Sequence, residues 1–277
     1  MKILSMRATP LGLNAGIILI GCLLLIAFFG ESFAPHDPNK MDLVRRLDGM
    51  SWTYPLGTDH LGRDVLSRLM SGTLLSLGAA IMTSMTILFI ALPIGLISAM
   101  IGGWVNHLLM RITDIFLAFP MIIFSLVIIG FLGASLNSAI IGVALAWWPS
   151  LARLVHTLTT DALSKDFVLA SRQCGISPLK LVIRHILPQI LPPLFVIMSL
   201  EMASILLVLS SLSFLGIGAQ PPEAEWGAML NEARPFFTER PGLLLAPGLL
   251  ISLAVMGFNL LGEGIRHKLD NRSPFRW

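Results

Sequence analysis

The sequence predicts an all-α integral membrane protein with six transmembrane helices. Its 277 residues are 55% hydrophobic and only 13% charged, with a mean hydropathy of +0.81, whereas about 25% of the residues in a soluble domain are charged. One soluble core cannot bury that much apolar surface, so lipid is the expected solvent. Six apolar runs lie close to the roughly 20 residues that cross a bilayer as a helix: residues 11–30, 74–101, 115–134, 136–152, 190–215 and 243–261.

The first span and the middle pair of spans carry further expectations. Residues 11–30 follow a basic start, as in a signal peptide, but this apolar run exceeds the roughly 7–15 residues of a signal-peptide core. We therefore expect an uncleaved anchor helix. The spans at 115–134 and 136–152 are almost continuous in the sequence and predict a helical hairpin.

The charge distribution predicts the orientation of the chain in the membrane. The net charge is +3 and the isoelectric point is about 9.2, but the basic residues sit in short segments beside the apolar runs, which does not indicate a nucleic-acid partner. With six spans, 12 of the 19 lysines and arginines fall on the side of the two termini, and seven fall on the other side. Lys and Arg are enriched in cytoplasmic segments, so both termini are expected in the cytoplasm.

The polar stretch at 153–188 predicts two short helices joined by a sharp turn. The first helix covers residues 167–174, and Gly175 directly after it can adopt the left-handed conformation that ends a helix at low cost. Ser177 is suited to cap the next helix, and Pro178 is suited to its first turn.

The second short helix is amphipathic and is expected to end at Pro188. Together with Ala170, Ser171 and Gly175, which permit close approach, its apolar face can dock into another protein. The same face can instead lie on the membrane surface, as a mere connection between two spans, and spacing alone leaves both alternatives open. The apolar positions recur at helical spacing: Leu179, Val182, Ile183 and Ile186.

The segment from Phe167 through Gly175 to Pro188 resembles the cytoplasmic EAA loop of bacterial binding-protein-dependent ABC permeases. Leu169-Ala170-Ser171 stands where that family usually has Glu-Ala-Ala. The resemblance implies that the loop carries a coupling helix, which inserts into a cleft on an ATPase subunit. The residues that it assigns to ATPase coupling are Phe167, Ala170, Ser171, Gly175, Ser177, Pro178 and Leu179.

Two further stretches are similar to the dipeptide, oligopeptide and nickel branch of that family. Residues 56–64 (LGTDHLGRD) resemble the branch signature that follows the first span, although Gly and Asp by themselves predict only turns there. Residues 213–218 (SFLGIG), with Pro221-Pro222 and Glu225-Trp226-Gly227, resemble the segment after the fifth span. The resemblance covers residues 10–270 and points to the C-type permease of the pair.

The resemblance implies a type I ABC importer permease fold in the bacterial inner membrane. Residues 1–72 are then an anchor helix with an external loop, and residues 73–277 a core permease domain whose coupling loop is 153–188. The implied partners are a homologous second permease, two ABC ATPase subunits, an extracytoplasmic substrate-binding protein and membrane lipid. The chain itself is expected to hold no cofactor, because ATP and Mg²⁺ belong to the ATPase subunits.

The sequence contains none of the catalytic motifs considered. It lacks GxxxxGK[ST], so it is not itself the ATPase. It also lacks His-Glu-x-x-His, paired aspartates and Gly-x-Ser-x-Gly, and its six histidines include no pair at metal-ligand helical spacing, which disfavours a structural zinc site. A membrane-embedded enzyme and a non-transporting scaffold are the alternatives of another class. Trp147 is expected to pack or to anchor at the interface, and Trp226 to belong to an aromatic belt rather than to serve as a docking anchor.

Glu201 interrupts the apolar run at 190–215. An ionisable residue at this depth is expected to face the protein interior or a water-filled path. It is either a protonated side chain hydrogen-bonded to Ser199, Ser204 or a neighbouring subunit, or a pore carboxylate that favours a cation. Carboxylate oxygens suit Ni²⁺, but no complete set of metal ligands is evident. The leading hypothesis is therefore import of nickel or a metal chelate, and the alternative is import of dipeptides or oligopeptides.

Overall fold

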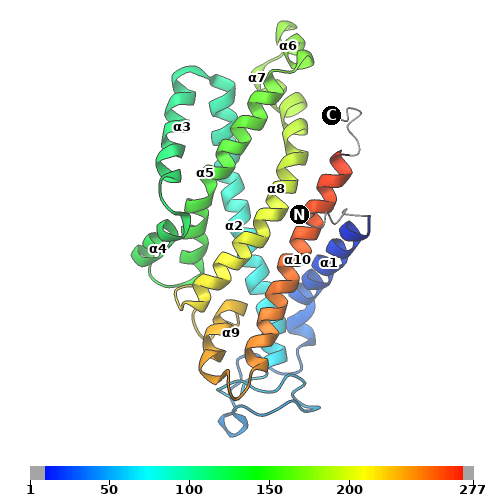
Figure 1. The fold of residues 1–277 in the computed structure, drawn as a ribbon, viewed down its shortest axis with the longest axis vertical. Helices are drawn as coiled ribbons and strands as arrows, with labels where there is room; N and C mark the ends of the chain where they lie inside the picture. Colours follow the sequence, from blue (N-terminus) through cyan, green and yellow to red (C-terminus); the bar gives the residue numbers. More distant parts are fainter. Residues whose placement is uncertain (1–9, 271–277) are drawn as a thin grey trace, which may run out of the picture.

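The computed structural model describes residues 10–270, and the regular secondary structure of this part of the chain is helical (Figure 1). Between α1 and α2 lies a long segment with little regular structure, and two short helices, α6 and α7, stand at the opposite end of the molecule (Figure 1). The helices are α1 (Pro10–Phe33), η1 (Leu43–Arg45), α2 (Val65–Ile101), α3 (Gly103–Leu117), α4 (Met121–Leu132), α5 (Leu136–Leu163), α6 (Asp166–Gln173), α7 (Pro178–Leu181), η2 (Val182–Ile186), α8 (Leu187–Phe214), α9 (Trp226–Ala233), η3 (Arg234–Phe236) and α10 (Gly242–Asp270).

In the described residues, five helical segments are long and apolar enough to cross a membrane, and six if the bent pair α3 and α4 counts as one span. These helices confirm the expected all-α membrane protein. Helix α1 exposes many large apolar side chains, which suit contact with lipid: Ile17, Ile18, Leu25, Phe28 and Phe29.

The third span differs from the expected straight helix at 115–134. Helix α3 begins at Gly103, and α4 starts only after a break and turns by 86°. Pro120 occupies the N-cap of α4, where its missing N–H costs nothing, and the residue before a proline is pushed out of the helical conformation. The sharp turn into α5 follows directly, at Gly133 and Ser135.

The fifth span begins earlier than expected. Helix α7, the π-helical turn η2 and α8 form one continuous segment, Pro178–Phe214. The expectation that the short amphipathic helix ends at Pro188 is therefore wrong. The π-helical turn directly before Pro188 widens the backbone, so the helix passes a residue that has no N–H and whose ring would crowd an ordinary turn.

Small residues let the long helices approach one another closely. Helix α5 packs along α2, while α10 packs against both α1 and α8. A side chain added at Gly95 of α2 would collide with Val155 and with the carbonyl oxygen of Ala152 on α5. This close contact fixes the depth of α5 beside α2, because it places residues 152–155 next to a defined turn of the neighbouring helix.

Candidate functional site

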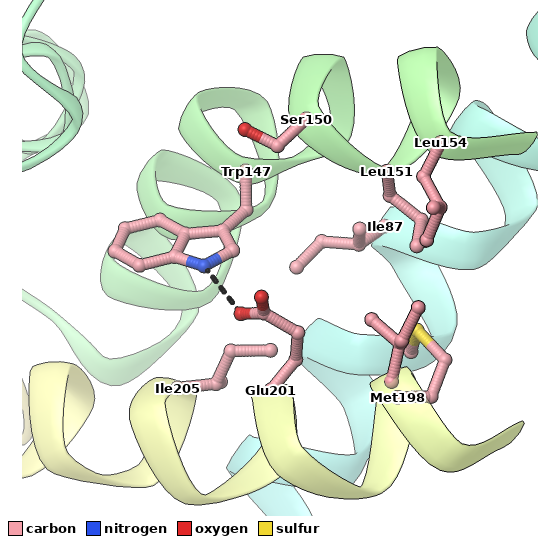
Figure 2. A pocket seen from close by; sticks show the side chains of 9 residues that line it. Ile87, Trp147, Ser150, Leu151, Leu154, Met198, Glu201 and Ile205 are labelled. Carbon is pink, nitrogen blue, oxygen red and sulfur yellow. Dashed lines mark hydrogen bonds between the residues drawn. The ribbon is translucent and has the colours of Figure 1, made fainter. Parts of the chain in front are cut away.

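Helices α2, α5 and α8 enclose a small cavity of about 80 Å³ that contains Glu201 (Figure 2). Glu201 reaches into it from α8, and Trp147 and Ser150 come from α5. The remaining walls are apolar: Ile87, Leu151, Leu154, Ile197, Met198 and Ile205. The cavity therefore presents one carboxylate on a largely hydrophobic surface.

The partner of Glu201 is Trp147, not a serine of its own helix. The indole Nε1–H donates to Glu201 Oε2 across 3.1 Å. Ser199 was a candidate partner, but its hydroxyl donates to the carbonyl oxygen of Phe195, one turn back in α8. Trp147, expected only to pack or anchor, thus holds the one carboxylate of the cavity in place. The two residues are 54 positions apart, and no local sequence signal joins them.

A charged cluster lies at the end of the bundle where the segment between α1 and α2 meets α2 and α9. Arg63 Nε donates to Asp59 Oδ2 at 2.6 Å, and Arg63 Nη2 donates to Glu232 Oε2 at 2.5 Å. Arg68 Nη2 donates to the same Glu232 oxygen at 3.1 Å. Both arginine side chains are only 1% exposed. Two cations and two carboxylates thus compensate one another in a buried site that joins three parts of the chain.

Asp59, His60 and Glu232 bring three potential metal-ligand atoms within 4.8 Å of one another. The arginines already bind both carboxylates, so a divalent cation would have to displace them. Burial lowers the pKa of His60 below its ordinary value, and the nearby Asp59 and Glu232 carboxylates oppose this shift without cancelling it. We assign this cluster to structure, because its charge is already balanced. The residue types alone predicted turns here, and the turns at Gly57 and Gly62, both with positive φ, are present.

The Glu225-Trp226-Gly227 motif begins α9 and is buried. Glu225 is the N-cap, and its carboxylate accepts from the Ala228 N–H at 2.9 Å and from the Ser76 hydroxyl at 3.2 Å. Trp226 is fully buried, so its expected place in an aromatic belt is wrong. A side chain at Gly227 would collide with the backbone of Ser210 in α8. The motif therefore locks α9 between α2 and α8.

At the opposite end, the expected helix–turn–helix is present. Helix α6 ends in a Schellman motif, in which the Gly175 N–H donates to Arg172 O and the Ile176 N–H donates to Ser171 O. Gly175 has a φ of +77°, the left-handed conformation that was expected. Ser177 occupies the N-cap of α7, with Pro178 in the first turn, but the Ser177 side chain makes no capping hydrogen bond.

The apolar side chains of this segment divide between two directions. Val168, Leu181 and Ile186 are buried against the bundle. Phe167, Leu169, Leu179 and Ile183 are exposed, Leu179 at 70% of its surface. The expected single face through Leu179 and Ile186 is therefore wrong, because the outer residues stay free while the inner ones anchor the segment. Ala170 is also exposed, and the Ser171 hydroxyl donates to its own helix at Phe167 O.

The long apolar helices define a multi-pass membrane protein. Residues 91–273 match the family described as binding-protein-dependent transport system inner membrane component, and the chain belongs to that family. It is thus a permease subunit of a bacterial ABC importer and is not itself catalytic. This membership removes the membrane-embedded enzyme and the non-transporting scaffold from consideration.

Relatives with different cargo names are similar to nearly the whole chain. The nickel transport system permease protein NikC of Escherichia coli (strain K12) is 39% identical over 92% of each chain. The glutathione transport system permease protein GsiD of Pectobacterium atrosepticum is 37% identical over 90% of this chain and 83% of the relative. The dipeptide transport system permease protein DppC of Alkalihalophilus pseudofirmus is 36% identical over 92% of this chain and 84% of the relative.

The fold is also that of a solved importer permease. Two inward-facing structures of the MetNI methionine ABC transporter contain a chain that superposes with TM-scores of 0.58 and 0.61. Each match covers 72% of this chain and 95% of the solved one, at 19% identity. At that identity the likeness concerns the fold alone.

Proposed function

We propose that this chain is the C-type permease of an importer for nickel or a metal chelate. The observation that carries this proposal is the Glu201 carboxylate, held by Trp147 inside an apolar cavity within a membrane span. A carboxylate at this depth attracts a cation, and one carboxylate without a full ligand set suits transient passage better than tight binding. The 39% identity to NikC supports the same cargo class.

Peptide import is the second candidate. GsiD and DppC, named for glutathione and dipeptide transport, are 37% and 36% identical to this chain. The cavity walls support this reading too, because they are mostly apolar and can accept small side chains. In this case Glu201 would meet the amino group of a peptide rather than a metal ion.

We further propose a type I importer topology with six spans and both termini in the cytoplasm. Residues 1–72 would form the anchor helix and external loop, and 73–277 the core permease domain. A cysteine at Asn271, which lies outside the described residues, should react with a reagent applied from the cytoplasmic side only. Labelling from outside would contradict this topology.

The coupling role is proposed for the exposed apolar residues around the Gly175 turn. Phe167, Leu169 and Leu179 are exposed beside it, and such side chains are typical of a docking surface. We propose that they dock on one of two ABC ATPase subunits, which bind ATP and Mg²⁺. A homologous second permease and an extracytoplasmic binding protein would complete the importer.

Uptake by the purified complex in proteoliposomes distinguishes the two cargo classes. The complex should be supplied with ATP and offered radioactive Ni²⁺ and a radioactive dipeptide in parallel. ATP-dependent accumulation of Ni²⁺ supports the nickel proposal, and accumulation of the dipeptide alone supports the second candidate. ATP-independent leakage of either probe would contradict a role in an ABC importer.

A further inference from the structure

Outside the Glu201 cavity, an ion pair joins the neighbouring helices α3 and α5. Arg153 on α5 donates through Nη2 to Asp114 Oδ1 on α3. Unlike the buried Arg63–Glu232 cluster, this pair is open: its side chains are 52% and 51% exposed. Helix α5 runs between α3 and α8 (Figure 1). Arg153 therefore lies on the same helix as Trp147, and Asp114 lies on the neighbouring α3.

The position of the pair along the bundle follows from the residues beside it. Gly95 contacts residues 152–155 of α5 and lies six residues before α2 ends at Ile101, a distance of about 9 Å along the helix. Exposed side chains nearby on α2 and α3 include the apolar Ile97, Leu108 and Ile115. Exposed charges beside such side chains are costly in lipid, so the pair is expected to face water or another subunit.

The pair belongs to a strip of polar residues on α3 and α5. On α3, His107, Arg111 and Asp114 are exposed at intervals of four and three residues, which places them on one helix face. On α5, Ser150 lines the Glu201 cavity, and Arg153 follows one turn later. The strip therefore runs from the cavity toward the end of the bundle that carries α6.

Building on the translocation role proposed above, we propose that Asp114 and Arg153 line the cytoplasmic end of the pathway and set its charge. A cation that leaves Glu201 next meets Arg153, whose charge would repel it. Asp114 neutralises that charge, so the pair adds no repulsion of a cation to that of Arg111 on the same strip. The pair thereby determines specificity: without Asp114, neutral cargo would pass while cationic cargo would be held back.

Uptake of three probes by the reconstituted complex tests this role. The probes are Ni²⁺, the cationic dipeptide Ala-Lys and the neutral dipeptide Ala-Ala. We expect Asp114→Asn to lower uptake of the cationic probes about tenfold relative to Ala-Ala, a change of about 1.4 kcal/mol. The double variant Asp114→Asn/Arg153→Gln removes both charges and should restore the wild-type ratio.

The outcomes separate this inference from the proposed function. Equal loss of cationic and neutral uptake in Asp114→Asn, or no recovery in the double variant, would overturn the specificity role and leave a structural or inter-subunit contact. If the wild-type complex moves only peptides, the ratio of Ala-Lys to Ala-Ala still tests the pair. If the wild-type complex moves none of the three probes, the proposed function itself fails.

Water access to the strip gives a second, independent readout. In a background with Cys22→Ala and Cys174→Ser, which removes both exposed cysteines, we expect a cationic thiol reagent to modify Ser150→Cys from the cytoplasmic side. Phe28→Cys, on the exposed apolar face of α1, is the matched lipid-facing control and should not react. Protection of Ser150→Cys in the assembled complex would overturn the aqueous path.

Discussion

The indole Nε1 of Trp147 lies 3.1 Å from Oε2 of Glu201, and this hydrogen bond joins α5 to α8 within the membrane-spanning bundle. The indole N–H can only donate, so Glu201 Oε2 is the acceptor and this carboxylate oxygen is held beside α5. The second carboxylate oxygen stays available to the cavity (Figure 2). A cation passing between the two helices would therefore meet an oriented acceptor.

Substitution of Glu201 separates a cation pathway from a structural role. Glu201→Gln keeps the volume and an oxygen that Trp147 can donate to, but it removes the charge. If Glu201 attracts the cargo, we expect this variant to assemble normally and to lose at least about tenfold in Ni²⁺ uptake, since about 1.4 kcal/mol of lost attraction is enough. Uptake of radioactive Ni²⁺ into proteoliposomes is the measurement.

Two companion variants interpret that result. Trp147→Phe keeps an aromatic ring but loses the N–H donor, so it should lower uptake less than Glu201→Gln does. Near-normal Ni²⁺ uptake by Glu201→Gln, combined with failed assembly of Glu201→Ala, would show that the hydrogen bond matters and the charge does not. The preference for nickel would then be wrong, while membership of the permease family would be unaffected.

The buried Arg63–Glu232 contact predicts a large effect on stability. Removing the carboxylate in Glu232→Ala leaves two arginines, each 1% exposed, with only Asp59 to compensate them. Breaking one side of a buried ion pair typically costs about 3–5 kcal/mol. We expect a clearly lower unfolding temperature for the detergent-solubilised complex. Glu239→Ala, in the same external segment but exposed, should leave that temperature nearly unchanged.

Glu225 predicts a pH dependence with the opposite sign from an ordinary paired carboxylate. Burial raises its pKa above 4.5, against the hydrogen bonds from Gly227, Ser213, Ala228 and Ser76, which lower it. The folded state then holds a proton that the unfolded chain has released, so the stabilisation is present below pH 4.5 and is lost as the pH rises through the raised value.

Thermal unfolding at a series of pH values measures this effect. Between about pH 5 and about pH 8, the unfolding temperature of the wild type should fall relative to that of Glu225→Gln, which does not titrate. Glu239→Gln, in the same segment, should follow the wild type. A Glu225→Gln curve parallel to the wild-type curve over this range would contradict a raised pKa.

Features that depend on local sequence could be predicted well. The run at 11–30 corresponds to α1 (Pro10–Phe33), and the run at 243–261 lies within α10 (Gly242–Asp270), because hydrophobic length alone decides whether a helix can cross a bilayer. The left-handed turn at Gly175 was also predictable, since few other residues adopt a φ of +77° at low cost.

Features that depend on contacts between distant segments could not be predicted. Arg63 and Glu232 are 169 positions apart, and nothing near either residue indicates the other. Trp226 looked like a membrane-interface residue because an aromatic in an external loop commonly is one, and only its packing beside α2 shows that it is buried. The break before α4 had a local signal in Pro120, but continuous hydrophobicity across it suggested one straight span.

Gly175→Val tests the proposed coupling role of the segment around α6 and α7. A Cβ at this position would meet no atom of this chain within 4 Å, so it causes no clash within the chain and the backbone conformation is the expected source of a defect. The left-handed conformation costs a residue with a Cβ roughly 1–2 kcal/mol, and a β-branched side chain is least suited to it. We expect normal membrane insertion, weaker association with the ATPase subunits and reduced ATP-driven uptake.

The backbone explanation has its own control in Gly175→Asn. Asparagine enters the left-handed region more readily than valine, so this variant should retain most of the uptake. Co-purification of the ATPase subunits and uptake in proteoliposomes should fall together in Gly175→Val, because the Schellman turn positions Phe167 and Leu179 relative to each other. Wild-type uptake by Gly175→Val would mean that the segment merely connects two spans, and equal loss in both variants would point to the bulk of the side chain at a closely packed interface.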